Sequence, residues 1–169
     1  MTYLGTSGIP ALLGDLGEAG ASRELFTWIA SGDLTFSIGI HVDALTGALL
    51  LVVTTVGALV HLYSVGYMSH DPGYWRFFAY LNLFMFSMLL LVLASNLLVV
   101  FAAWELVGLS SYLLIGFWYT KREPGLAAKK AFITNRVGDV GFALGLMGLV
   151  AVFGTLDIPT VLAGVAAGE

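Results

Sequence analysis

The sequence contains no cysteine and little charge for its length. The absence of cysteine excludes disulfides, thiolate metal ligands and a cysteine nucleophile. Charged residues make up 11% of the 169 residues and hydrophobic residues 59%, whereas about a quarter of a soluble domain is charged. A soluble domain of this size needs polar faces on its surface helices, and several long runs here have almost none. The composition therefore indicates a membrane protein.

Several sequence patterns for ligand binding are also missing. There is no phosphate-cradling glycine loop, no dinucleotide fingerprint and no pair of histidines at metal-ligand spacing. The net charge of −4 comes without a basic patch of the kind that binds nucleic acid. We therefore expect no cofactor, no metal and no nucleic-acid partner. The apolar run at residues 9–13 is too short for a signal peptide, so we expect insertion through the first spanning helix.

Four segments are apolar and long enough to cross a bilayer. The hydrocarbon core is roughly 30 Å thick, which takes about 20 helical residues. The four predicted spans are residues 43–63, 76–95, 97–119 and 129–153. Only Asn96 separates the second span from the third, which predicts a tight helical hairpin. Residues 120–125 combine charge, proline and glycine, which predicts a loop in water.

The segment before the first span has a different period. Residues 34–42 alternate apolar and polar side chains, as a strand with one buried face does. Residues 26–29 can pair with this strand across a turn at residues 30–33. The predicted fold class is thus an all-α polytopic membrane protein of four transmembrane helices, preceded by a short β-hairpin in an extramembrane segment, residues 1–42. Residues 1–22 show no clear period, and residues 154–169 are expected to form an external tail.

The basic residues predict the orientation of the chain. If the N-terminus lies outside, six of the seven basic residues fall in or near the cytoplasmic side, as the positive-inside rule requires. They are Arg76, Lys121, Arg122, Lys129, Lys130 and Arg136, which leaves only Arg23 outside. We therefore expect a multi-pass protein of a bacterial cytoplasmic membrane.

Glu105 is the most informative single residue. It lies eight residues beyond Leu97 in the third span, which places it about 12 Å below the membrane surface. A charge at the bilayer centre costs about 2.5 to 3.5 kcal/mol and commonly marks an ion path. A movable cation beside Glu105 would let it take up and release a proton. The alternative is a protonated glutamate that fixes helix packing. Gly108 and Tyr112 share its helical face.

The fourth span carries three charged residues on one stripe. Lys129, Arg136 and Asp139 fall within about 80 degrees of the helix circumference. One interpretation is a self-neutralised pair of Arg136 and Asp139 near the interface, with Lys129 extending to water. The other is a proton uptake route or a link to an adjacent subunit. His61, near the end of the first span, is either a proton relay or a packing residue.

Several long motifs carry a resemblance to a known family. Residues 104–109 read Trp-Glu-Leu-Val-Gly-Leu, and residues 111–119 read Ser-Tyr-Leu-Leu-Ile-Gly-Phe-Trp-Tyr. Together with residues 61–68, 77–84 and 130–139, they resemble the antiporter-like L subunit of NADH:quinone oxidoreductase, respiratory complex I. The resemblance extends over roughly residues 25–156. Leu106 stands where the L subunit usually has glycine. Mrp-type sodium/proton antiporter subunits and membrane subunits of inorganic-carbon uptake complexes have a similar glutamate helix.

The resemblance implies a proton-translocating subunit without a redox centre of its own. It makes Glu105 the glutamate of a proton half-channel, with Arg136 and Asp139 as polar residues of the next helix. The family pairs that glutamate with a lysine on a later helix, beyond the end of this sequence. We therefore expect a fragment of a larger antiporter-like bundle. Its expected partners are the remaining helices of that subunit, other membrane subunits of a respiratory complex, and lipid. The alternatives are an inert structural fragment and a free-standing small channel.

Overall fold

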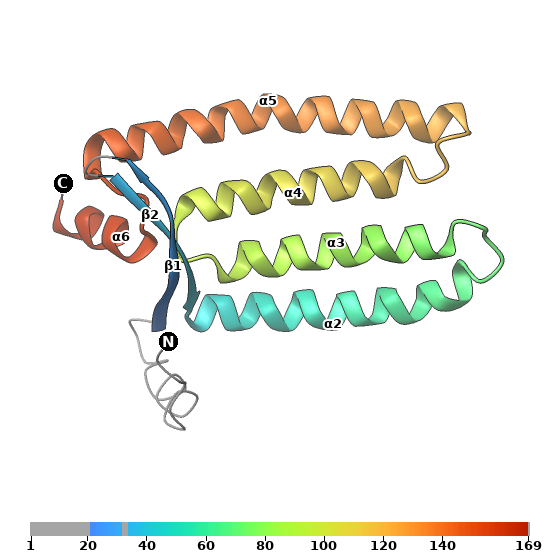
Figure 1. The fold of residues 1–169 in the computed structure, drawn as a ribbon, viewed down its shortest axis with the longest axis horizontal. Helices are drawn as coiled ribbons and strands as arrows, with labels where there is room; N and C mark the ends of the chain where they lie inside the picture. The colour runs from blue at the N-terminus through green and yellow to red at the C-terminus, as the bar shows by residue number, and fades with distance from the viewer. Residues whose placement is uncertain (1–20, 32–33, 169) are drawn as a thin grey trace, which may run out of the picture.

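The chain forms a row of four long helices with a small sheet across one end. The computed structural model describes residues 21–31 and 34–168. The long helices are α2 (Ala44–Tyr67), α3 (Tyr74–Leu93), α4 (Leu97–Ile115) and α5 (Arg122–Phe153). The strands β1 (Ala21–Ser31) and β2 (Leu34–Val42) and the short helix α6 (Ile158–Ala167) lie at what we term the sheet end (Figure 1). The opposite, loop end carries the α2–α3 and α4–α5 connections.

The four long helices are the predicted spans. Each is long and apolar enough to cross a membrane, and an antiparallel hairpin precedes them, so the predicted fold class is confirmed. No structure was assigned from the sequence to residues 1–22, of which residues 1–20 lie outside the described residues and Ala21 and Ser22 belong to β1. Residues 32–33 of the predicted turn also lie outside the described residues.

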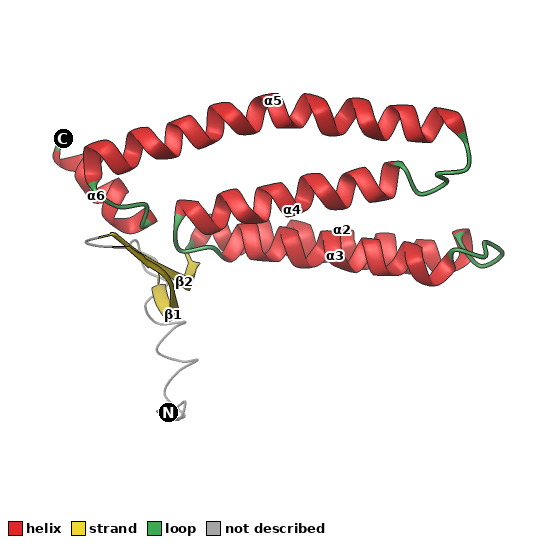
Figure 2. Cartoon of the chain, turned by 45° about the horizontal axis from the view of Figure 1, so that its top comes forward, coloured by secondary structure: helices red, strands yellow, loops and turns green. Residues whose placement is uncertain are grey.

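The helices pack as an open row rather than a closed bundle. The main contacts run between consecutive helices, α2 with α3, α3 with α4, and α4 with α5, and α5 lies apart from α2 and α3 (Figure 2). Small residues sit at the contacts: Ser87 and Ser110 are fully buried, and each hydroxyl donates to a carbonyl of its own helix at 2.7 Å. Many large apolar side chains point outward, so lipid or further helices must cover them.

The β-hairpin packs over the α3–α4 connection. A Cβ atom on Gly39 of β2 would lie 2.6 Å from the Ser95 hydroxyl, so only glycine allows this close approach. Asn96 accepts a hydrogen bond from Val99 N at 2.9 Å, which caps α4. Its side-chain amide also donates to the carbonyl of Ser37 in β2. One residue therefore fixes both the start of α4 and the position of the sheet.

Several helix boundaries differ from the sequence expectation. Helix α5 begins at Arg122, seven residues before the expected start, and α4 ends at Ile115. Pro124 therefore lies in the first turn of α5, where its missing N–H has no intrahelical partner to lose. Helix α6 occupies residues expected to form a tail. Asp157 caps it by accepting from Thr160 N at 3.1 Å, and Pro159 follows at the start of the helix.

Candidate functional site

Three charged side chains meet between α4 and α5. Arg136 of α5 forms ion pairs with Glu105 of α4 and with Asp139 one turn further along its own helix. The distance from Arg136 Nη1 to Asp139 Oδ2 is 3.2 Å. The sequence predicted the pair within α5, and the structure adds Glu105 to it. We call Glu105, Arg136 and Asp139 the charge cluster.

Trp104 provides a second partner for the Asp139 carboxylate. Its indole Nε1 donates a hydrogen bond to Asp139 Oδ1 at 2.9 Å, while Asp139 Oδ2 faces Arg136. Both oxygens of this buried carboxylate therefore act as acceptors. The sequence analysis assigned Trp104 no role. A signal was present, because most other tryptophans and tyrosines flank the ends of the spans whereas Trp104 lies deep beside Glu105.

Aromatic and small residues hold the guanidinium in place. The Arg136 guanidinium carbon lies 4.3 Å from the centroid of the Phe132 ring, one turn earlier on α5. A Cβ atom on Gly108 would lie 3.8 Å from Arg136 Nη2, an ordinary contact distance. Arg136 therefore packs against the face of α4 that carries Glu105 and Gly108. Tyr112, one turn further, packs its ring against Phe132 at 5.2 Å between centroids.

A cavity of about 480 Å³ opens beside the cluster. It is bounded by α3, α4 and α5, and Trp104 and Asp139 line it. Its other polar side chains are Ser111, Thr134 and Asn135. Glu105 and Arg136 are not among its described lining residues. Water in this cavity would reach the charge cluster through Asp139.

The structure does not bring Lys129 or His61 into the cluster. Lys129 lies seven residues before Arg136 on α5, a rise of about 10 Å, and lines a different cavity near the loop end. His61 Nδ1 is 2.7 Å from the Gly57 carbonyl of its own helix, to which it donates. Its ring centroid lies 6.0 Å from that of Phe78 on α3. This geometry matches the packing interpretation of His61.

The charges of the cluster do not balance. Two carboxylates share one guanidinium, which leaves a net charge of minus one when both acids are ionised. An unbalanced charge is costly in a medium of low dielectric, and one bound proton removes it. Asp139 already uses both oxygens as acceptors. Glu105 has one described partner in the cluster, Arg136, whereas Asp139 has two.

Two family models match separate parts of the chain. The first, NADH-ubiquinone oxidoreductase (complex I) chain 5 N-terminus, matches residues 28–78. The second, the transmembrane model of NADH:quinone oxidoreductase and Mrp antiporters, matches residues 94–168 and so includes the whole charge cluster. The chain belongs to the antiporter-like membrane subunits of NADH:quinone oxidoreductase. This confirms the resemblance found in the sequence.

Named relatives of this subunit family agree closely with the chain. It is 51% identical over 163 residues to NADH-quinone oxidoreductase subunit L of Mycobacterium tuberculosis, covering 94% of this chain and 26% of that protein. It is 53% identical over 146 residues to subunit L of Rhodobacter capsulatus, covering 82% and 20%. NAD(P)H-quinone oxidoreductase chain 5 of Synechocystis is 48% identical over 152 residues, covering 89% and 22%. The chain thus spans about a quarter or less of the length of these antiporter-like subunits.

The hydrogen bond from Trp104 to Asp139 gives a testable coupling between α4 and α5. Trp104→Phe keeps an aromatic ring and removes the N–H donor, so it should lower the free energy of unfolding by about 1 kcal/mol. In an Asp139→Ala background the same change should have almost no effect, because the acceptor is gone. Unfolding in mixed detergent micelles measures both. Trp75→Phe, at an exposed tryptophan (82%), is the matched control. Equal losses in both backgrounds would contradict the coupling.

Proposed function

We propose that the chain is part of a proton-translocating membrane subunit of NADH:quinone oxidoreductase, with Glu105 as the proton-carrying residue. Arg136 and Asp139 control the charge beside Glu105, and Trp104 orients Asp139. The subunit carries no redox chemistry in this mechanism. It moves protons in response to conformational or electrostatic change elsewhere in the complex.

The observation that supports the proposal is one guanidinium shared between two carboxylates of the apolar helices α4 and α5. When Arg136 lies against Glu105, the carboxylate is stabilised and its proton is released. When Arg136 moves toward Asp139, Glu105 loses its counter-ion and binds a proton instead. Arg136 contacts both acids from one position, so a small side-chain movement suffices. The cavity beside Asp139 supplies room for water on one side of the charge cluster.

The family models and the names of the relatives favour complex I over the other antiporter-like assemblies. The description of one model covers both NADH:quinone oxidoreductase and Mrp antiporters, and that of the other names complex I alone. Because the chain covers only 20–26% of these relatives, its partners in the proposal are the further helices of an antiporter-like subunit and the neighbouring membrane subunits.

We propose that the loop end faces the cytoplasm and the sheet end faces outside. The chain has no cysteine, so a single cysteine replacing Thr120 provides a unique label site in the α4–α5 connection. In inside-out vesicles an impermeant maleimide should label Thr120→Cys, whereas in right-side-out vesicles it should not. A cysteine at Thr27, in β1 at the sheet end, is the matched control and should give the opposite pattern. Labelling of Thr120→Cys only from outside would reverse the orientation.

Deleting the coding region for residues 43–153 tests whether the chain works in this complex. The deletion should lower proton uptake by inside-out vesicles driven by NADH and leave uptake driven by ATP unchanged. If an Mrp-type antiporter is the parent, the deletion will impair sodium-dependent pH recovery instead. If NADH-driven proton uptake and sodium-dependent pH recovery are both unchanged by the deletion, the result would indicate an inert fragment.

A further inference from the structure

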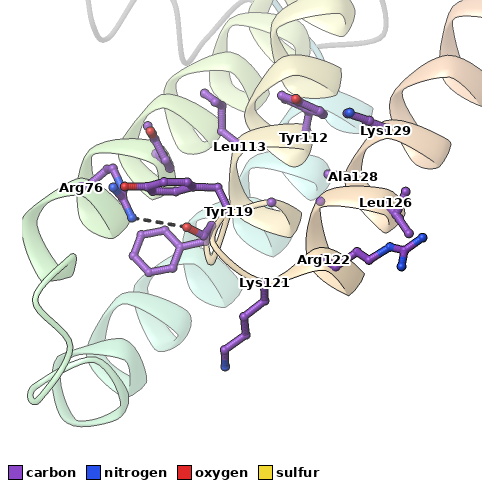
Figure 3. A pocket seen from close by; sticks show the side chains of 13 residues that line it. Arg76, Tyr112, Leu113, Tyr119, Lys121, Arg122, Leu126, Ala128 and Lys129 are labelled. Carbon is purple, nitrogen blue, oxygen red and sulfur yellow. Dashed lines mark hydrogen bonds between the residues drawn. The ribbon is translucent and has the colours of Figure 1, made fainter.

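A second cavity lies at the loop end, away from the charge cluster. Its volume is about 490 Å³, and its walls come from α3, the end of α4 and the first turns of α5 (Figure 3). Four basic residues line it: Arg76, Lys121, Arg122 and Lys129. No carboxylate occurs among its described lining residues. The cavity is thus a local concentration of positive charge in a chain whose net charge is −4.

Arg76 is fixed at this cavity with an unused donor. Its Nη2 donates to the Phe117 carbonyl at 3.3 Å, and its guanidinium carbon lies 4.8 Å from the Phe117 ring centroid and 5.0 Å from that of Tyr119. Its Nε is buried and has no hydrogen-bond partner in the described part of the chain. A buried donor without an acceptor is unfavourable. An oxyanion in the cavity would accept from the η nitrogens of this guanidinium, because Nε itself is closed off.

Lys129 approaches the cavity from the opposite wall. In Figure 3 its side chain extends from α5 toward Tyr112, whereas Lys121 and Arg122 extend outward. Arg76 and Lys129 thus line the cavity from two different helices, α3 and α5. Lys121 and Arg122, at the rim of the cavity, raise its positive electrostatic potential.

The start of α5 adds backbone donors to the same cavity. Arg122 and Gly125 of its first turn line the cavity. Lys121, at the N-cap position, makes no side-chain hydrogen bond to that turn. The first N–H groups of a helix lack intrahelical partners, and they carry a partial positive charge that favours anions. They thus complement the guanidinium of Arg76 and the ammonium of Lys129.

The cavity lies at the loop end of the apolar helices. A Cβ atom on Gly116, just beyond α4, would lie 3.2 Å from Ala128 Cβ, which places Lys129 beside the end of a membrane span. Trp75 and Tyr119 are 82% and 70% exposed at this end, as residues of an interfacial aromatic belt are. Leu113 and Leu126 give the cavity apolar walls beside its basic residues. A free anion would contact only the basic residues of the cavity, whereas a lipid would contact the basic residues with its headgroup and the apolar walls with its acyl chains.

Asp71 lies near the cavity and offsets part of the positive charge of Arg76 and Lys121. It accepts from Trp118 Nε1 at 2.9 Å and from Gly73 N at 2.7 Å. These two hydrogen bonds, with the nearby charges of Arg76 and Lys121, hold the pKa of Asp71 below its usual value. It therefore stays ionised near neutral pH and orders the α2–α3 connection without lining the cavity.

We propose that this cavity binds the phosphate of an anionic membrane lipid, with Arg76 and Lys129 in contact with the phosphate oxygens. The acyl chains would follow the apolar wall toward the membrane interior. The proposal is independent of proton translocation, because none of its residues belongs to the charge cluster. The shared chemistry is a phosphate oxyanion, and the experiment separates a lipid from free phosphate.

Lipid binding to the 169-residue chain in phosphatidylcholine nanodiscs tests the proposal. Added phosphatidylglycerol should bind with saturation, and native mass spectrometry should show it retained in preference to phosphatidylcholine. Loss of one lysine contact should weaken binding about fivefold in Lys129→Gln. Lys130→Gln is the matched control. It removes the same charge from the next residue of α5, which is exposed and does not line the cavity, and should leave affinity unchanged.

A second variant, Arg76→Gln, and a competition experiment with inorganic phosphate complete the test. Arg76→Gln should weaken binding more than Lys129→Gln, and if Arg76→Gln fails to fold, the Lys129 and Lys130 variants decide the question alone. Inorganic phosphate should not displace phosphatidylglycerol. The proposal is overturned if phosphatidylcholine is retained equally, or if Lys130→Gln weakens binding as much as Lys129→Gln. Displacement by inorganic phosphate, lost in Lys129→Gln, would instead identify a free-phosphate site and reject the lipid.

Discussion

Replacing Arg136 with glutamine is expected to destabilise the chain more than neutralising either carboxylate. Arg136 is the one cation in contact with both Glu105 and Asp139 among the described residues. Removing it leaves two acids facing each other in a medium of low dielectric. Breaking a buried ion pair from one side costs about 3 to 5 kcal/mol. Because the side chains of Arg136 and Glu105 are 31% and 29% exposed, we expect a loss below this range, of about 2 kcal/mol, in the free energy of unfolding for Arg136→Gln.

The same geometry predicts a mild effect of Asp139→Asn. If Arg136 paired with Asp139 alone, this change would leave a cation without a counter-ion. Because Glu105 also contacts Arg136, the remaining pair is neutral. Arg136→Gln combined with Asp139→Asn leaves a single carboxyl group that can be neutralised by one proton, so it should be milder than Arg136→Gln alone.

Denaturation of the purified variants in mixed micelles, followed by helical circular dichroism, measures this order. The expected ranking of stability is wild type, Asp139→Asn, the double variant and then Arg136→Gln. Lys130→Gln, an exposed basic residue of the same helix, controls for the loss of a positive charge and should resemble wild type. A loss for Asp139→Asn as large as that for Arg136→Gln would show that Glu105 does not share the cation.

The fold could be predicted because its signals are local. The length of an apolar run fixes a span, and the alternation in residues 34–42 fixes a strand. Both read directly from the sequence, and both are present in the structure. Helix α6 was missed because its ten residues are too few to span a membrane. Its capping residue Asp157 and the proline that follows were signals for it.

The start of α5 shows how one residue type can mislead. Pro124 within a charged stretch favours a loop when it is taken as a helix breaker. In the first turn of a helix, however, proline is tolerated because no intrahelical acceptor waits for its N–H. The helix therefore begins at Arg122. This early start brings Arg122 and Gly125 to the wall of the basic cavity.

The charge cluster could be predicted only in part. The depth of Glu105 and the spacing of Arg136 and Asp139 follow from helix geometry along one helix each. The contact between Glu105 and Arg136 depends on how α4 and α5 are rotated and shifted against each other, which no local pattern specifies. Lys129 shares the stripe of Arg136 on a helical wheel. Its different depth along α5 separates the two residues.

We propose that Glu105 carries a proton rather than packing two helices together. Glutamine has nearly the shape of glutamate and retains hydrogen-bonding capacity, so it can keep a packing role. It cannot titrate. Glu105→Gln also leaves Arg136 paired with Asp139 at 3.2 Å, so the cluster stays neutral and the fold should be preserved. Glu105→Asp retains a titrating group on a shorter side chain and should retain part of the activity.

The most direct test is proton pumping by the reconstituted parent complex carrying Glu105→Gln, measured beside its NADH oxidation and its assembly. We predict full assembly with proton uptake reduced at least tenfold relative to wild type, an increase of about 1.4 kcal/mol or more in the activation free energy, and partial uptake in Glu105→Asp. Normal proton uptake by a fully assembled Glu105→Gln complex would contradict the account and leave Glu105 a structural residue.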